Sequence, residues 1–320
     1  MVGVRPIQCA FPVLPAFLAT FFFALNATCA NHSIRLIGTL RANLSRLVIG
    51  TAVLGLFAHT LGRGFSSAGT AWFFVSGVVG LGVGDLGSYA ALPLLGSRLT
   101  VLMIQCLAAP LAAIGEWWWL GTRLSAAQIL CGAAILSGVA LAIAPSRENP
   151  PRVRVRPIGL LYGFIGACGQ GLGAALLSRK AVMVAAAAGE SVTNVTFGLT
   201  AAYERLVAGL AFTLGWFLVL RLLRRLPLPP VPHSPHPTAR SPFFWAVANG
   251  LAGPVAGVGC YQWALSTTPS GVVLPIAATT PLVSIPIAFW LEGDRPSRRS
   301  ILGGLIAVAG CVVLTIVSHH

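Results

Sequence analysis

Long apolar runs separated by short polar or charged segments dominate the sequence. Each run extends for about 20 residues, the length that an α-helix needs to cross the hydrocarbon core of a bilayer. Charged residues, or clusters of Gly, Pro and Ser, bound the runs and mark the turns between them. The pattern predicts ten spanning helices, at residues 10–30, 43–61, 70–91, 99–120, 124–144, 158–178, 199–221, 242–264, 271–291 and 300–317.

The composition supports a protein embedded in a membrane. Of the 320 residues, 56% are hydrophobic and 9% are charged, whereas soluble domains carry about 25% charged residues. The mean hydropathy is +0.83. The predicted helices leave only short connectors, which excludes a separate soluble domain. We therefore expect an all-α, multi-pass membrane protein that has the lipid bilayer as its first partner.

Basic residues and cysteines narrow the function further. The 21 Lys and Arg residues outnumber the 7 Asp and Glu residues, but many lie in connectors such as the one that contains Arg152, Arg154 and Arg156. This clustering is typical of loops in membrane proteins, so we predict no nucleic-acid partner. The seven cysteines lie inside apolar runs and lack the spacing of metal ligands. We predict no metal and no cofactor.

A basic connector at residues 145–157 divides the chain into two halves, residues 10–144 and 158–317. The second predicted helix of the first half contains RLVIG at residues 46–50. The second predicted helix of the other half contains RLVAG at residues 205–209. These matching segments predict an internal repeat of five helices.

A constant offset relates the later helices of the two halves. It carries Pro110-Leu111 to Pro281-Leu282 and Trp119-Leu120 to Trp290-Leu291. Because five is an odd number, the second repeat must enter the membrane from the opposite face. Inverted repeats are typical of secondary transporters, whose substrate sites lie where the halves meet.

These features resemble the drug/metabolite transporter superfamily, and within it the ten-helix EamA-type transporters. The resemblance covers nearly the whole chain. It rests on an arginine in the second helix and a proline in the penultimate helix of each half, and on a motif and glycines near the end of the chain. These residues are Arg46, Arg205, Pro110, Pro281, Trp290-Leu291-Glu292-Gly293, Gly303, Gly304 and Gly310.

The sequence departs from the family pattern at two places. Gly121 stands where a glutamate would end the penultimate helix of the first half. The connector at residues 221–242 is longer and richer in proline than the family pattern leads us to expect. These departures weaken any assignment of a substrate subfamily.

The resemblance implies a secondary-active transporter that exports a small amino-acid-like metabolite or a drug by alternating access, with coupling to protons or another cation. It also implies a bacterial inner-membrane location and no enzymatic activity. A membrane-embedded transferase-type enzyme, a passive channel and a scaffold are the alternatives. The sequence contains no His-x-x-x-His motif and no Gly-rich phosphate loop that would support an enzyme.

Charged residues inside apolar runs are the first candidates for a transport pathway, because such charges are costly in a membrane. Asp85 lies well inside the third predicted helix among several glycines. It is a candidate proton- or cation-binding carboxylate, and the alternative is a packing residue bonded to nearby polar groups.

Glu204 and Arg205 are consecutive, so their side chains diverge by about 100° on a helix. We place Arg46 and Arg205 as candidates at opposite mouths of a central cavity, where they would attract an anionic group such as a carboxylate. The alternative is that both arginines extend to the membrane interface.

Uncharged polar residues complete the candidate pathway. Asn26 and Gln170 occupy similar places in the first helix of each half, and Tyr261 combines an aromatic ring with a hydroxyl group. We predict that all three line the cavity. Proline removes a helical hydrogen bond, so Pro110 and Pro281 are predicted hinges.

Two indications conflict on orientation. Most basic residues in the predicted connectors lie on the side opposite the chain termini, so the positive-inside rule places the termini outside the cell. The family resemblance implies termini in the cytoplasm.

Overall fold

The computed structural model describes residues 13–95, 97–143, 156–222, 241–283 and 298–317. These residues form helices joined by short turns, without a β-strand among them. The label η marks a π-helical segment. The first half contains α1 (Leu14–Ile37), α2 (Thr39–Thr60), α3 (Thr70–Gly77), η2 (Val78–Gly84), α4 (Asp85–Leu95), α5 (Ser97–Gly115), η3 (Glu116–Leu120) and α6 (Ala126–Ile143).

The second half also consists of α-helices interrupted by π-helical segments. It contains α7 (Pro157–Cys168), η4 (Gly169–Leu177), α8 (Ser178–Ala187), α9 (Val195–Leu222), α10 (Pro242–Gly250), η5 (Leu251–Val258), α11 (Gly259–Thr267), α12 (Ser270–Ala278) and α14 (Arg298–Val317).

The prediction of ten spanning helices is confirmed in part. Seven helical segments within the described ranges are long and apolar enough to cross a membrane. Three shorter apolar helices, Ala126–Ala142, Ser270–Val283 and Ile301–Val317, occupy the places of the other predicted spans. Residues 284–297, which include Trp290 and Glu292, lie outside the described residues. The chain is an all-helical, multi-pass membrane protein.

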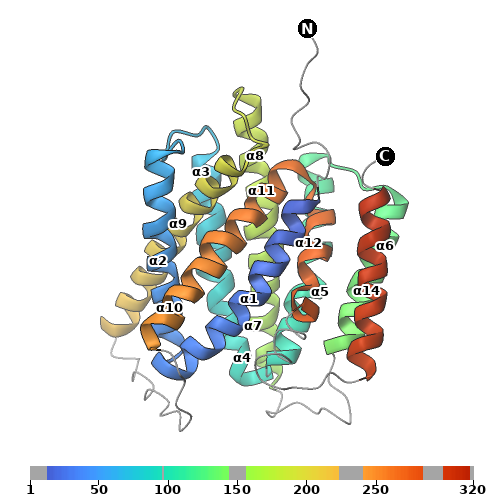
Figure 1. Cartoon of the computed structure of the whole chain (residues 1–320), viewed down its shortest axis with the longest axis horizontal. Helices are drawn as coiled ribbons and strands as arrows, with labels where there is room; N and C mark the ends of the chain where they lie inside the picture. The colour runs from blue at the N-terminus through green and yellow to red at the C-terminus, as the bar shows by residue number, and fades with distance from the viewer. Residues whose placement is uncertain (1–12, 96, 144–155, 223–240, 284–297, 318–320) are drawn as a thin grey trace.

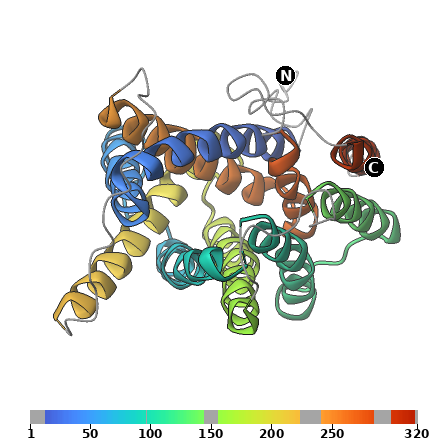
Figure 2. The same ribbon diagram turned by 90° about the horizontal axis from the view of Figure 1, so that it is seen from below.

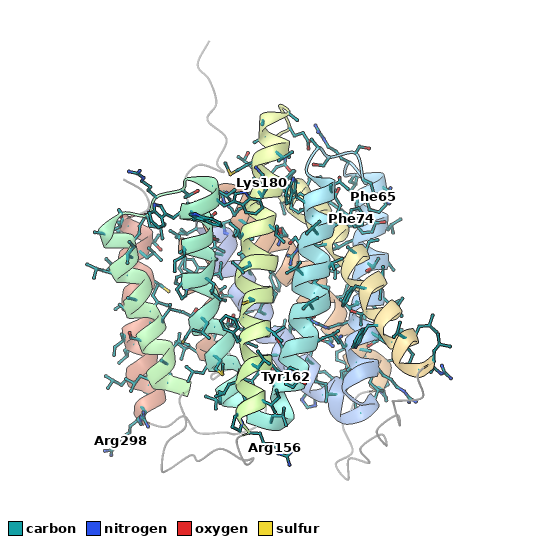
Figure 3. All side chains as sticks on the ribbon, turned by 180° about the vertical axis from the view of Figure 1, so that it is seen from behind. Phe65, Phe74, Arg156, Tyr162, Lys180 and Arg298 are labelled. Atoms are coloured by element: carbon teal, nitrogen blue, oxygen red, sulfur yellow. The ribbon has the colours of Figure 1, made fainter. Side chains whose placement is uncertain are left out.

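The two halves begin at opposite ends of the molecule. Figure 1 shows α1 descending from the end where α14 finishes, whereas α7 ascends from the other end toward α8. We call the first of these the upper end and the second the lower end. In the reverse view, Arg156 and Arg298 lie at the lower end and Lys180 lies toward the upper end (Figure 3).

The last helices of the two halves pack against each other at the edge of the bundle. Figure 2 shows α6 and α14 at the periphery, away from α9. A Cβ atom on Gly138 would lie 2.6 Å from the carbonyl oxygen of Gly303. The absence of side chains at both positions therefore permits this close helix contact, a common arrangement in membranes.

One predicted boundary is wrong. The apolar pattern predicted that a spanning helix ends at residue 178, with Arg179 and Lys180 in the following loop. In the structure the helical segment continues to Ala187. An alanine-rich stretch with strong helix propensity extends this helix. Arg179 consequently lies inside a membrane-spanning segment, Pro157–Ala187.

The two predicted hinge prolines have different surroundings. Pro110 lies inside α5, which stays helical on both sides of it. Pro281 lies two residues after Thr279, which caps the C-terminus of α12 (Ser270–Ala278). The helical path is therefore interrupted next to Pro281 and continuous through Pro110.

Candidate functional site

A charged cluster joins α2 to α4 in the lower half of the molecule. Arg46 Nη2 donates to Asp85 Oδ2 at 2.8 Å, and Arg46 Nε donates to Asn43 Oδ1 at 2.7 Å. The side chains of Arg46 and Asp85 are 17% and 27% exposed. The pair is thus partly accessible, although both residues lie within spanning segments.

A second arginine, Arg205, lies beside the π-helical segment η2 that precedes Asp85. The backbone N–H of Asp85 donates to the carbonyl of Gly80, five residues earlier. This i→i+5 hydrogen bond places Asp85 one π-helical turn after Gly80. A Cβ atom on Gly80 would lie 3.2 Å from Arg205 Nη2, so the guanidinium of Arg205 occupies the space that glycine leaves open.

Arg205 is 2% exposed, and its charge acts on Asp85. The expectation that Arg46 and Arg205 lie at opposite mouths of a cavity stays a prediction. Arg46 bonds directly to Asp85, whereas Arg205 lies beside Gly80 and acts on Asp85 through its charge. The cluster has two guanidinium groups for one carboxylate, and Arg205 Nε has no hydrogen-bond partner among the described residues.

Glu204 points away from this cluster, as its divergence from Arg205 requires. Its side chain is buried and accepts a hydrogen bond from Thr70 Oγ1 on α3 at 2.7 Å. Its other oxygen, Oε2, has no partner within the described residues. The structure therefore separates the two consecutive charged residues into two environments.

The predicted cavity-lining residues fall on three helices. Tyr261 on α11 is buried, and its ring centre lies 6.1 Å from that of Phe23. Asn26 on α1 contacts η5, where a Cβ atom on Gly253 would collide with its Oδ1 atom. Gln170 is half-buried in η4.

Several polar atoms along α1, α10 and α11 are buried without a hydrogen-bond partner in the described part of the chain. Such atoms are costly unless water or a ligand satisfies them. They belong to Asn26, Asn249, Tyr261 and Gln262.

The sequence pattern did not predict a buried ion pair, Glu116–Arg179, at the upper end. Arg179 Nε donates to Glu116 Oε1 at 2.8 Å, and Arg179 Nη1 donates to the carbonyl of Leu265 at 2.6 Å. The backbone N–H of Ser270 donates to Glu116 Oε2 at 2.9 Å. The carboxylate therefore joins η3 and α8 to the N-terminus of α12, where a negative charge is favourable.

Comparisons with known proteins agree with this architecture. The model of the EamA-like transporter family matches residues 10–144 and 158–316, which together make up most of the sequence. The chain belongs to the EamA-like transporter family. No curated protein shows significant similarity to it.

A solved structure titled only as the crystal structure of a protein has the same fold. The two chains share 19% sequence identity and a TM-score of 0.69, and the alignment covers 96% of each. This similarity supports the helical arrangement of the EamA-like chain and says nothing about its substrate. Within the described residues, no three His, Cys, Asp or Glu side chains gather to hold a metal ion.

Proposed function

We propose that this EamA-like protein is a secondary-active exporter of a small, carboxylate-bearing metabolite of the amino-acid type. The observation that carries the proposal is the cluster of Arg46, Asp85 and Arg205. Arg46 bonds to Asp85 and the charge of Arg205 acts on the same carboxylate inside apolar helices, so the cluster has one positive charge in excess when all three groups are ionised. Such an excess is costly in a membrane unless an anion shares the site.

The surroundings of the cluster support this substrate chemistry. A substrate carboxylate would accept hydrogen bonds from Arg205 and compete with Asp85 for Arg46, because a guanidinium binds carboxylates in a fork geometry. Tyr261, Asn26 and Gln262 carry the unpartnered polar atoms that could bind further polar groups. Phe23 next to Tyr261 supplies an apolar surface for a side chain.

Alternating access follows from the same proposal. Ten helices in two inverted repeats, residues 10–144 and 158–317, would move against each other around the cluster. The Glu116–Arg179 pair ties the upper end across both halves, and it would have to separate for release at that end. Pro281, beside the break at Thr279, is the proposed hinge.

Export is defined relative to the cytoplasm, and the basic residues indicate which end of the protein faces it. Arg156 and Arg298 lie at the lower end (Figure 3), so the positive-inside rule favours a cytoplasmic lower end. A C-terminal fusion to alkaline phosphatase then gives phosphatase activity outside the cytoplasm. Fluorescence of a C-terminal fluorescent protein without phosphatase activity would instead place the upper end in the cytoplasm.

A resistance screen and a transport assay test the function itself. Cells that overproduce the protein should resist toxic analogues of the exported metabolite, which identifies the substrate. The purified protein in liposomes should then show saturable counterflow of that substrate. Flux without saturation or counterflow would indicate a channel, and a covalently changed substrate would indicate an enzyme.

A further inference from the structure

A small cavity between the loops at residues 61–69 and 188–194 reaches Glu204. Its volume is about 180 Å³, and its polar lining includes Arg63, Ser67, Asn194 and Glu190. These loops follow α2 and α8, which both finish at the upper end (Figure 1). The cavity therefore connects a buried carboxylate to the upper end of the molecule, away from the cluster around Asp85.

Glu204 differs from every other buried carboxylate that the structure describes in lacking a cationic partner. It is 0% exposed, and no salt bridge within the described ranges includes it. Asp85 pairs with Arg46 and Glu116 pairs with Arg179. Among the residues that the structure describes, only Thr70 bonds to Glu204, and the Oε2 atom has no partner. An ionised group in this state is costly inside a membrane, so its presence calls for a function.

The chemistry around Glu204 fits a proton better than a metal cation. Mg²⁺ and Ca²⁺ take about six or more oxygen ligands, whereas one carboxylate and the Thr70 hydroxyl meet here. A protonated carboxyl group carries an O–H donor at one oxygen and still accepts at the other. The Thr70 hydrogen bond to Oε1 can therefore persist while Oε2 gains and loses a proton.

We propose that Glu204 is a reversible proton-binding site that exchanges protons with the upper end of the molecule through this cavity. A proton from hydronium in the aqueous phase forms an O–H bond at Oε2 and leaves a water molecule behind. Asp85, which has Arg46 as a counter-ion, keeps the arginines in place when substrate is absent. This assignment moves the coupling carboxylate from Asp85, the first candidate from the sequence, to Glu204.

Few other groups near Glu204 can respond to pH. The loops contribute Arg63 and Glu190, which pair at 3.3 Å. Tyr203 on α9 shares a 3.1 Å hydrogen bond with His59 on α2. The adjacent segments α3, η2 and η5 carry no titratable side chain. The remaining groups on α9 and on the elements packed against it are Arg41, Arg46, Arg205, Arg221, Cys260 and Tyr261.

Infrared difference spectroscopy on the full chain in lipid nanodiscs tests the proton site without any substrate. Between alkaline and acidic pH, the wild-type protein should gain the C=O band of a protonated carboxyl group in an apolar environment. Glu204→Gln should lose this band, whereas Glu190→Gln, which removes a carboxylate from the same cavity, should keep it. A band that survives in Glu204→Gln, or that vanishes in Asp85→Asn, would overturn the proposal.

A second variant tests the route from the upper end. Thr200 lines the cavity, and its hydroxyl donates to the carbonyl of Thr196 on its own helix. Thr200→Leu should fill the cavity and slow the growth of the carboxyl band severalfold after a rapid pH jump, while Thr200→Val should leave the rate nearly unchanged. An unchanged rate in Thr200→Leu would show that the proton does not use this cavity.

The inference rests on the proposed function only where it calls Glu204 the coupling site. If the infrared band is assigned to Glu204 but no substrate shows counterflow, the transport proposal fails and the proton site stands. If counterflow is present and the band is absent from the wild type, the proton site fails and transport stands.

Discussion

Glu116 and Glu204 are glutamates with equal burial and unequal partners. They are 1% and 0% exposed. Both oxygens of Glu116 accept hydrogen bonds, one from Arg179 and one from the backbone of Ser270. Within the described part of the chain, Glu204 has one hydrogen bond, from Thr70, and one oxygen without a partner. Depth of burial therefore does not distinguish the two carboxylates, and their hydrogen-bond partners do: on this basis we assign Glu116 a structural role and propose a functional one for Glu204.

Glu116→Leu should give the largest effect on stability. The substitution leaves Arg179 buried without its carboxylate, which costs about 3–5 kcal/mol in comparable buried pairs. Denaturant unfolding in detergent micelles measures this loss. Combining Glu116→Leu with Arg179→Met removes both charges and should recover much of the stability. A single variant as stable as the wild type would contradict a structural role for the pair.

Gly84→Ala should lower the unfolding free energy by an intermediate amount. Gly84 precedes Asp85 and lies in the contact between η2 and η4. A Cβ atom on Gly84 would lie 2.7 Å from the Cα atom of Gly169 on η4, and overpacking of this kind costs about 1–3 kcal/mol. Gly304→Ala is the matched control, because nothing lies within 4 Å of its Cβ position. Equal unfolding free energies for the two variants would show that the η2–η4 contact adapts freely.

Glu204→Leu should have the smallest effect on the unfolding free energy, although it removes the proposed proton-binding carboxyl group. Only the hydrogen bond from Thr70 is lost, and such bonds contribute about 0.6 kcal/mol in membrane proteins. Denaturant unfolding under the same conditions as for Glu116→Leu provides the comparison. A loss as large as that of Glu116→Leu would mean that Glu204 is also a structural anchor.

The sequence predicted the positions of the helices and the charged candidate residues better than the contacts between those residues. Apolar runs located the helices, and the charges within them pointed to Asp85, Arg46, Arg205 and Glu204. Hydropathy carries no information on how helices rotate against one another, so it could not show that Arg46 bonds to Asp85 or that Arg205 lies beside Gly80. The π-turn between Gly80 and Asp85 likewise has no signature in the apolar pattern.

The Glu116–Arg179 pair was missed for a related reason. Glu116 precedes three tryptophans, a composition typical of a membrane interface, and Arg179 followed a predicted helix end. The longer helix through α8 places Arg179 within a spanning segment, where it needs a partner. A search for charges of opposite sign near the ends of neighbouring spans could have suggested this pair.

The most direct test of the central claim is counterflow in liposomes with a substrate carboxylate and its carboxamide analogue. Wild-type protein should transport the carboxylate and discriminate against the carboxamide. Arg205→Gln should lose carboxylate transport by at least about tenfold, since a hydrogen bond to a charged group contributes about 1.5–3 kcal/mol, and should no longer discriminate. Glu190→Gln serves as a control for the loss of a charge outside the cluster. Carboxylate transport by Arg205→Gln at the wild-type rate, with discrimination intact, would contradict the account.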